Sequence, residues 1–419
     1  MAKWSDYNFA VADGNHTIMY NARTGAMARM AHERIDQIEA PETLDDAFVD
    51  FLLSQGFLVS DDTNEIDLIA QAHEQARETE NMFSATIELT ETCNFRCQYC
   101  YQPHEAKNLE PDAEQRIIKY LKRRLRDVPH LHLNWFGGEP LIKIDVLERI
   151  AREMTDATKK PGHQLSQVIT TNGYLLDHAM AHRLATIGIE NVQITLDGDQ
   201  QTHDALRPLS TGKGTYQKVL AACGHVVAAG MELMVRINVT KWNAGRVGTL
   251  LDDLAEHGVS PVNTVIHAVR AIDHGNCAGP IQQQLFTNAD FAKAWIGILG
   301  VVKSHGYGLP SLAPRAYNCT FDLHKTVMIG GDGSLRHCSS SSGLLGRIGE
   351  NGEETDPTAL LQTIKERRPL DDTRCRACRY LPMCMGGCSY LQEIGQEKCN
   401  PETHVLPELL SLSAQQASS

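Results

Sequence analysis

The sequence lacks a long hydrophobic run, a signal peptide and an excess of basic charge. Its apolar segments fall short of the roughly 20 residues that span a membrane, and residues 1–6 do not begin a signal peptide. The formal net charge of −13 argues against nucleic acid and mildly favours a neutral or basic substrate, although a solvated acidic surface explains it as well. We therefore predict a cytoplasmic protein that binds neither nucleic acid nor a membrane.

Cysteine, in contrast, is abundant, with 12 residues in a chain of 419. In a reducing cytoplasm such cysteines are more often metal ligands than disulfide partners. Ten of them fall between residues 93 and 100 or between residues 319 and 399, and the exceptions are Cys223 and Cys277. The composition, 42% hydrophobic and 22% charged, is that of a globular chain with two or three domains.

The first cysteine group follows a predicted strand over residues 84–90. Cys93, Cys97 and Cys100 have C-x3-C-x2-C spacing, and three thiolates can hold three irons of a cubane cluster while a fourth iron stays open to a substrate. A zinc site or incidental cysteines are the alternative, but zinc prefers four ligands. The spacing resembles the signature of radical S-adenosylmethionine (SAM) enzymes. There the open iron binds SAM, and reductive cleavage gives a 5′-deoxyadenosyl radical.

From residue 84 to about 300, short apolar segments alternate with longer amphipathic ones. After the first strand, further strands are expected at 131–136, 166–170, 191–196, 232–239 and 262–269. Repeated βα units predict a parallel sheet with right-handed crossovers, and six of them form a partial (β/α)6 barrel. Chemistry in such barrels lies at the carboxyl ends of the strands, where the cysteine loop is expected.

Two motifs follow the second and third strands. Gly137 and Gly138 let the backbone approach a ligand closely, although such a pair is usually just a turn. At this offset they match the superfamily's motif for the SAM amino group, with Glu139 in support. Thr171 and Asn172 are expected to bind the ribose or carboxylate of SAM, and a helix-entry turn is the alternative.

The fourth and fifth strands add further candidates. Asp197 stands in a stretch that resembles the superfamily's and is expected to bind ribose hydroxyls, whereas Arg207 is interpreted as a helix-surface cation. Arg236 and Asn238 alternate on the fifth strand, so we expect both to face the interior near the SAM carboxylate, where a core arginine finds the partner it needs. Tyr99, beside the third cysteine, is expected to pack by the adenine.

The second cysteine group resembles the SPASM domain, which in relatives holds two auxiliary four-iron clusters. The resemblance implies a distal cluster on Cys375, Cys378, Cys384 and Cys399. It implies a proximal cluster on Cys319, Cys338 and Cys388, which lacks a fourth cysteine. The alternative is one zinc on Cys375, Cys378, Cys384 and Cys388, which leaves the other three cysteines unexplained.

Several groups are open as the fourth proximal ligand. Cys277, His324 and His337 are candidates, and an open iron that binds substrate is another. A plain loop thiol is the simpler interpretation of Cys277. Cys223 lies in an apolar helical segment and is expected in the core.

Residues 1–83 form a separate unit in the sequence pattern. Strands at 7–11, 17–20 and 26–30 precede a helix that ends at Gly56, a strand over 57–60 and a helix over 64–80. The pattern suits a winged-helix-like α+β module and resembles the recognition domains of peptide maturases, in which an exposed strand accepts a leader peptide. A packing extension is the alternative. The predicted domains are therefore 1–83, 84–305 and the loop-rich 306–405, with a tail at 406–419.

The resemblance implies a radical SAM and SPASM enzyme with three 4Fe–4S clusters, SAM and an external one-electron reductant, flavodoxin or ferredoxin. Auxiliary clusters accept a second electron from the substrate radical, which favours oxidative crosslinking. We predict a maturase that forms a thioether or carbon–carbon crosslink in a ribosomally synthesised precursor peptide. One alternative is a sulfatase-type maturase that makes formylglycine, which the N-terminal extension disfavours. The other is a non-enzymatic zinc or electron-relay scaffold, which the Gly137-Gly138 motif disfavours.

Overall fold

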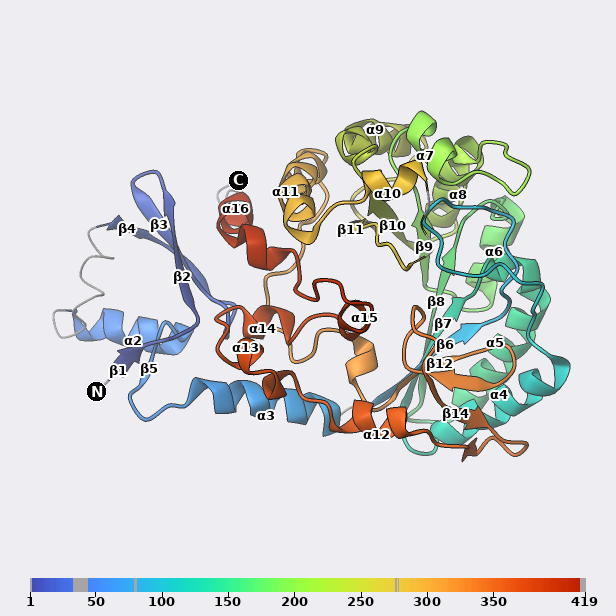
Figure 1. The fold of residues 1–419 in the computed structure, drawn as a ribbon, viewed down its shortest axis with the longest axis horizontal. Helices are drawn as coiled ribbons and strands as arrows, with labels where there is room; N and C mark the ends of the chain where they lie inside the picture. Colours follow the sequence, from blue (N-terminus) through green and yellow to red (C-terminus); the bar gives the residue numbers. More distant parts are fainter. Residues whose placement is uncertain (1, 33–43, 79–80, 276, 278, 415–419) are drawn as a thin grey trace. The chain divides into compact units, whose positions relative to one another are not determined.

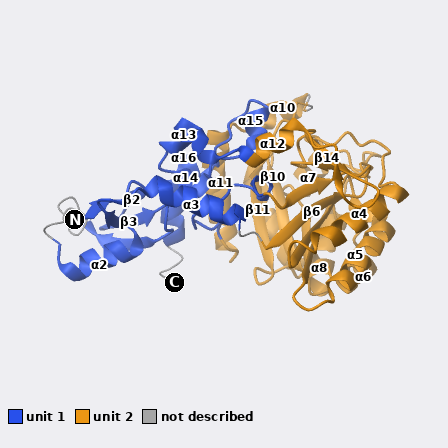
Figure 2. Ribbon diagram, turned by 90° about the horizontal axis from the view of Figure 1, so that it is seen from below, with its two compact units in different colours: residues 1–79, 309–323, 366–419 blue, residues 80–308, 324–365 orange. Residues whose placement is uncertain are grey.

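The computed structural model describes the chain except residues 1, 33–43, 79–80, 276, 278 and 415–419. The chain forms two compact units (Figure 2). Unit 1 combines residues 1–79, 309–323 and 366–419, and unit 2 combines residues 80–308 and 324–365. Among the described residues, no helix is both long and apolar enough to cross a membrane.

Unit 2 is built on a ten-stranded sheet (Figure 1). Six adjacent strands of this sheet are parallel: β6 (Met82–Glu88), β7 (His130–Phe136), β8 (Gln164–Thr171), β9 (Asn191–Thr195), β10 (Glu232–Val239) and β11 (Thr264–Arg270). They are the six strands expected from the sequence. The predicted α/β fold class is confirmed.

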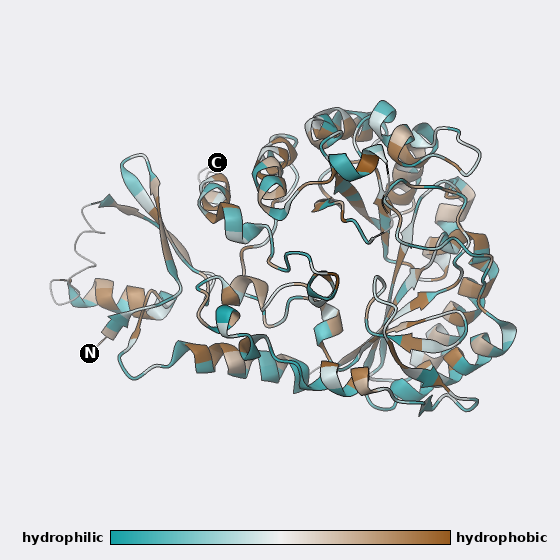
Figure 3. Ribbon diagram, viewed as in Figure 1, coloured by the Kyte–Doolittle hydropathy of each residue, from teal (hydrophilic) through white to brown (hydrophobic). Residues whose placement is uncertain are grey.

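Helices connect these strands. The longer ones are α4 (Pro111–Arg124), α5 (Ile144–Thr158), α6 (His178–Thr186), α7 (Gln200–Leu206), α8 (Tyr216–Ala228), α9 (Val247–Glu256) and α11 (Asn288–Ser304), with α10 (Pro280–Gln284), η2 (Pro140–Lys143) and η3 (Ala244–Arg246) as short turns. Hydrophobic and hydrophilic residues alternate along the helices (Figure 3). Leu131, Leu133 and Trp135 on β7 are fully buried, whereas the residues between them are less so, as expected for a sheet with helices on one face. Cys223 is buried within α8, as predicted.

Residues 324–365 extend this same sheet. Strand β12 (Thr326–Ile329) pairs in parallel with β6. Three antiparallel strands follow, namely β13 (Ser334–Arg336), β14 (Leu344–Ile348) and β15 (Glu354–Thr355). The compact units therefore differ from the consecutive domains expected from the sequence, because the free edge of β6 takes up a strand from the cysteine-rich region.

Unit 1 contains the N-terminal strands and the C-terminal helices. Strands β2 (Asn8–Asp13), β3 (His16–Asn21) and β4 (Met27–Ala31) form the expected meander, and β1 (Ala2–Trp4) pairs with β5 (Leu58–Ser60). Its helical segments are α2 (Asp46–Gln55), α3 (Glu65–Glu78), η4 (Thr320–Asp322), η5 (Pro369–Asp371), α13 (Thr373–Arg376), α14 (Leu381–Cys384), α15 (Ser389–Glu393) and α16 (Glu402–Ala414), with α12 (Ala359–Glu366) at the boundary. The cysteine-rich region predicted to be loop-rich thus carries short helices. Of the predicted tail, residues 406–414 belong to α16 and the rest lies outside the described residues.

One apolar cluster in unit 1 joins the two ends of the chain. Tyr7, Ile18 and Tyr20 from the N-terminal strands pack with residues of α14 and α16, among them Leu381 and Leu406. The N-terminal residues therefore share a core with the second cysteine group instead of forming a core that is entirely their own.

This shared core gives a first prediction. Leu406 is fully buried, so Leu406→Ala is expected to lower the free energy of unfolding of unit 1 by about 2–5 kcal/mol, because the change leaves a cavity. Leu68→Ala, at a residue of α3 that is 40% exposed, is the control and is expected to change it by less than about 0.5 kcal/mol. Urea titration compares the two variants, and equal effects would contradict the shared core.

Candidate active site

The cysteine loop begins directly after β6 and is held by backbone hydrogen bonds. The amide of Arg96 donates to the carbonyl oxygen of Pro208, and that of Gln98 to the carbonyl oxygen of Leu206, both at 2.9 Å. The guanidinium of Arg96 folds back and donates to the carbonyl oxygen of Cys93 at 2.8 Å. The loop is thereby fixed against the end of α7.

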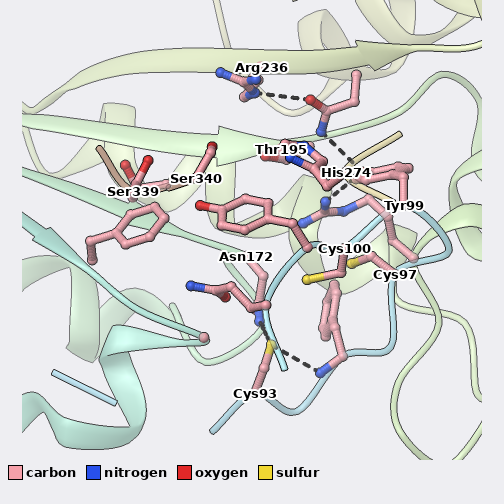
Figure 4. A pocket seen from close by; sticks show the side chains of 18 of the residues that line it. Cys93, Cys97, Tyr99, Cys100, Asn172, Thr195, Arg236, His274, Ser339 and Ser340 are labelled. Carbon is pink, nitrogen blue, oxygen red and sulfur yellow. Dashed lines mark hydrogen bonds between the residues drawn. The ribbon is translucent and has the colours of Figure 1, made fainter. Parts of the chain in front are cut away.

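A cavity of about 310 Å³ opens beside this loop, at the carboxyl ends of the strands. Its volume falls within the range of small-molecule sites, about 300–1,000 Å³. Most of the predicted site residues line it: Cys93, Cys97, Tyr99, Cys100, Gly137, Gly138, Thr171, Asn172, Arg236 and Asn238. Figure 4 shows the cysteine sulfur atoms together on one side of the pocket, and Arg236 apart from them. The structure thus brings together residues from four separate segments.

Gly137 and Gly138 have a more specific reason to be glycine than access for a ligand. The amide of Gly138 donates to the carbonyl oxygen of Thr90 at 2.7 Å. A Cβ atom on Gly138 would lie 2.6 Å from the carbonyl oxygen of Glu91 and closer still to that of Thr92. The backbone that leads into the cysteine loop therefore leaves no room for a side chain here.

Glu139 lies behind the cavity wall. Its side chain is fully buried, and it accepts hydrogen bonds from the Thr171 hydroxyl at 2.7 Å and from the amides of Asn172 and Leu141 at 2.7 and 3.0 Å. Burial raises the pKa of the Glu139 carboxyl, and these three bonds oppose the rise. Glu139 thus ties the end of β7 to the end of β8.

Asp197 is also fully buried, and both of its carboxylate oxygens have partners. One oxygen accepts from the amide of Asn238 at 2.7 Å, and the other accepts from the hydroxyl of Tyr99. That hydroxyl accepts in turn from Arg207 Nη1 at 2.8 Å and from Asn238 Nδ2 at 3.1 Å. The Arg236 Nε extends the network by donating to Asn238 Oδ1 at 3.0 Å. Asp197 therefore organises the polar residues around the cavity.

The interpretation of Arg207 as a helix-surface cation is wrong. Arg207 is only 6% exposed and lines the cavity. Its guanidinium lies 5.6 Å from the centre of the Phe95 ring, within the cysteine loop. The Nε atom is buried and has no hydrogen-bond partner in the described part of the chain. The sequence placed Arg207 just beyond a helix, but the contact with Tyr99 spans more than a hundred residues and no local pattern reports it.

Without a metal, the three thiols of the loop are poor nucleophiles. Burial raises the pKa of Cys93 and of Cys97 to about 11 each, and burial also raises the pKa of Cys100. A metal that binds them displaces their protons, because the thiolate is the ligand. The three thiols can hold an iron–sulfur cluster. The unpaired buried guanidinium nitrogen of Arg207 can donate to a small anionic ligand beside it, and the cavity has the volume for such a ligand.

Comparison with known families agrees with an iron–sulfur site at these cysteines. Residues 87–267 match the family model described as the Radical SAM superfamily. The chain contains a radical SAM domain. The prediction of a radical SAM domain is confirmed, and the superfamily implies a 4Fe–4S cluster and SAM as cofactors.

The matched relatives include enzymes with different named activities. Fe-coproporphyrin III synthase of Methanosarcina barkeri (strain Fusaro / DSM 804) is 27% identical over 171 residues, which are 41% of this chain and 40% of that protein. PqqA peptide cyclase of Streptomyces rochei is 29% identical over 182 residues, 42% of this chain and 47% of that protein. The alignments thus span less than half of the length of these relatives.

Solved structures resemble a larger part of the chain. Native anSMEcpe with bound AdoMet has a TM-score of 0.61 at 17% identity, and the match covers 80% of this chain and 100% of that one. Streptococcus suis SuiB bound to precursor peptide SuiA has a TM-score of 0.55 at 14% identity, and the match covers 96% and 98% of the two chains. At these identities the likeness shows the fold alone.

Some residues that line the cavity of the radical SAM domain were not found from the sequence. Tyr101 and His274 line it with ring centres 4.8 Å apart, and Ser339 and Ser340 join them from the loop after β13. These residues stand in loops without a spacing motif. His104 also lines the cavity, and no sequence motif marks it. Its left-handed backbone conformation is visible only in the structure.

The predicted distal cysteines all belong to unit 1. Burial raises the pKa of Cys384 to about 12, and the charges of Cys399, Cys378 and Cys375 raise it further. Cys384 therefore lies within electrostatic reach of the other three. The amide of Cys378 donates to the carbonyl oxygen of Cys375 at 3.0 Å, which folds their C-x2-C segment into a turn.

The predicted proximal cysteines are divided between the units, with Cys319 and Cys388 in unit 1 and Cys338 in unit 2. The assignment of a proximal cluster stays a prediction. Cys277, one candidate for its fourth ligand, is 8% exposed and packs against Leu206 and Ile281. This packing favours the interpretation of Cys277 as a structural thiol.

Proposed function

We propose that this chain is a radical SAM maturase that forms a thioether or carbon–carbon crosslink in a ribosomally synthesised precursor peptide. The observation that carries the proposal is the single cavity onto which Cys93, Cys97 and Cys100 open together with the polar strand ends. When bound there, a 4Fe–4S cluster and SAM supply a radical that removes a hydrogen atom from an unactivated carbon.

We assign roles to the cavity residues from their position at the cavity and from the hydrogen bonds that they already make. The unpaired Nε of Arg207 suits the carboxylate of SAM, with Arg236 as a second cation. The backbone at Gly137 and Gly138 suits its amino group. Thr171, Asn172 and Tyr99 contact the rest of SAM, whereas Glu139 and Asp197 position these residues from behind the cavity wall. This division replaces direct ribose binding by Asp197, whose two oxygens already accept protein hydrogen bonds.

Three observations support a peptide as substrate. Among the matched relatives, one is named PqqA peptide cyclase, and the fold matches SuiB bound to a precursor peptide over 96% of this chain. In the described part of unit 1, β4 is an edge of the three-stranded sheet. An edge strand can accept an extended leader peptide by strand addition. The net charge of −13 is compatible with a neutral or basic peptide.

Crosslinking removes two hydrogens from the peptide, so it needs an acceptor for the second electron. We propose two auxiliary 4Fe–4S clusters in that role. The distal one is held by Cys375, Cys378, Cys384 and Cys399, and the proximal one by Cys319, Cys338 and Cys388. The charges of Cys399, Cys378 and Cys375 all act on the Cys384 thiol, which supports the first assignment. Flavodoxin or ferredoxin supplies the first electron in the cytoplasm.

The test is formation of 5′-deoxyadenosine by the anaerobically reconstituted, reduced chain. We expect product from the wild type and none from the variant with Cys93, Cys97 and Cys100 all changed to Ala. Iron is expected to fall from roughly twelve to about eight per chain, because each cubane holds four. Cys223→Ala is the matched control, because Cys223 lies in the core of α8, and it is expected to keep both activity and iron.

Two results would contradict the proposal. One is zinc in place of iron in the wild type. The other is an iron-replete wild type that makes no 5′-deoxyadenosine even with precursor peptide present. Mass spectrometry of the peptide then tests the finer claim. A crosslink lowers the peptide mass by two hydrogens and leaves no aldehyde, whereas oxidation of serine to formylglycine gives the same mass loss with an aldehyde that reacts with a hydrazide.

A further inference from the structure

His104 lines the cavity of the radical SAM domain and departs from ordinary geometry in two ways. Its backbone φ is +56°, a left-handed conformation that is unfavourable for a residue with a Cβ atom. Its ring nitrogen Nδ1 is buried and has no hydrogen-bond partner among the residues that the structure describes. Both features cost free energy, and such costs persist where they serve a ligand site.

The position of His104 indicates which ligand it faces. It follows Cys100 by four residues on the segment that leads from the cysteine loop to α4. Its ring also lies within electrostatic reach of Arg96, which stands between Cys93 and Cys97 in the loop. His104 and the three thiols line the same cavity.

The protonation state of His104 restricts what the ring can do. Burial lowers the pKa of His104, and the charge of Arg96 lowers it further. The ring is therefore neutral near pH 7, with one N–H donor and one acceptor nitrogen. His104 lines the same cavity as Cys93, Cys97 and Cys100, and thiolates and cluster sulfides accept hydrogen bonds, so a cluster on these cysteines offers acceptors for a ring N–H.

We propose that His104 donates its buried Nδ1–H to a sulfur atom of the cluster held by Cys93, Cys97 and Cys100, and so raises the reduction potential of that cluster. The inference rests on the proposed function. One electron enters from an external one-electron reductant, and no bond forms or breaks in the protein. Reduction increases the negative charge on the sulfurs, so an N–H donor stabilises the reduced cluster more than the oxidised one. His104 is thus a positioning and tuning residue for the site.

Two substitutions distinguish the effect of the His104 ring from the effect of its backbone conformation. His104→Gly removes the ring and suits the left-handed backbone. His104→Asn also tolerates this conformation and keeps an N–H donor. We expect the glycine variant to lower the equilibrium constant for one-electron reduction about tenfold, which corresponds to a midpoint potential about 59 mV lower. The asparagine variant is expected to recover part of that difference.

The measurement is a potentiometric titration of the full reconstituted chain, followed by the electron paramagnetic resonance signal that changes on addition of SAM. Asp356→Gly is the matched control, because Asp356 also has a left-handed backbone, with φ +52°, and does not line the cavity. Its potential is expected to equal that of the wild type. His104→Phe, which keeps a ring without an N–H, replaces the glycine variant if that variant binds no iron, and the same tenfold loss is expected.

The outcomes distinguish this inference from the proposed function. An unchanged potential in the glycine or phenylalanine variant, with a normal SAM-dependent signal in the wild type, overturns the role of His104 alone. A wild-type chain without any SAM-dependent signal overturns the proposed function and this inference together. A lower potential with partial recovery in His104→Asn supports the hydrogen bond.

Discussion

Replacing Gly138 by alanine is expected to abolish 5′-deoxyadenosine formation and to destabilise unit 2 by about 1–3 kcal/mol. The added Cβ atom would lie 2.6 Å from the carbonyl oxygen of Glu91 and closer still to that of Thr92. These are backbone atoms of the segment that enters the cysteine loop, so they can yield only if the loop moves. Movement of that loop displaces Cys93 from its place beside the cavity.

The measurement pairs SAM cleavage with urea titration of the same preparation. Gly297→Ala is the control, because Gly297 lies inside α11 and a Cβ atom there meets nothing within 4 Å. That change is expected to raise stability by about 0.5–1 kcal/mol, since alanine loses less backbone entropy than glycine. A Gly138→Ala variant that cleaves SAM at the wild-type rate would show that the wall beside the loop is not rigid.

Local sequence patterns predicted most of the barrel. Each strand from β6 to β11 is a short apolar segment bounded by loops, so each can be recognised from its own residues alone. The cysteine loop is equally local, because its three cysteines lie within eight residues of one another. Such local features can be predicted without knowledge of the tertiary contacts.

The sequence failed where a contact joins distant segments. Arg207 looks like a surface cation at the end of a helix, and only the network with Tyr99 and Asp197 shows that it is a buried group. The pairing of β12 with β6 joins residues more than two hundred positions apart, so no window of sequence contains both strands. The reason for glycine at Gly138 is also a contact with another segment.

The same network explains why Arg207 is the second residue whose loss is expected to be severe. Arg207→Leu is expected to destabilise unit 2 by about 1–3 kcal/mol, because it removes the stronger of the two cations that offset the buried Asp197 charge and leaves only Arg236. It also removes one of the two groups that donate to the Tyr99 hydroxyl oxygen, and only Asn238 Nδ2 then donates to it. SAM cleavage is expected to be lost, since the substitution removes the buried, unpaired Nε of a residue that lines the cavity.

The loss of stability in Arg207→Leu should depend on pH in a defined direction. Burial raises the pKa of the Asp197 carboxyl, and Arg207 opposes the rise. Without Arg207, the folded state holds the Asp197 proton to a higher pH than the unfolded state does. Stability is then retained at low pH and lost as the pH rises through the folded-state pKa, so the deficit relative to wild type is expected to be larger at about pH 8 than at about pH 5.

Two further variants decide whether the buried pair causes this loss. In Arg207→Leu combined with Asp197→Asn, the buried carboxylate charge is removed as well, so the double variant is expected to be more stable than Arg207→Leu at about pH 8. Arg347→Leu is the control, because the Arg347–Asp332 pair at 3.2 Å is about half exposed on both sides. An exposed pair of this kind contributes less than about 1 kcal/mol. If the double variant is no more stable than Arg207→Leu, the charge on Asp197 does not depend on Arg207, and the network is held together by packing instead.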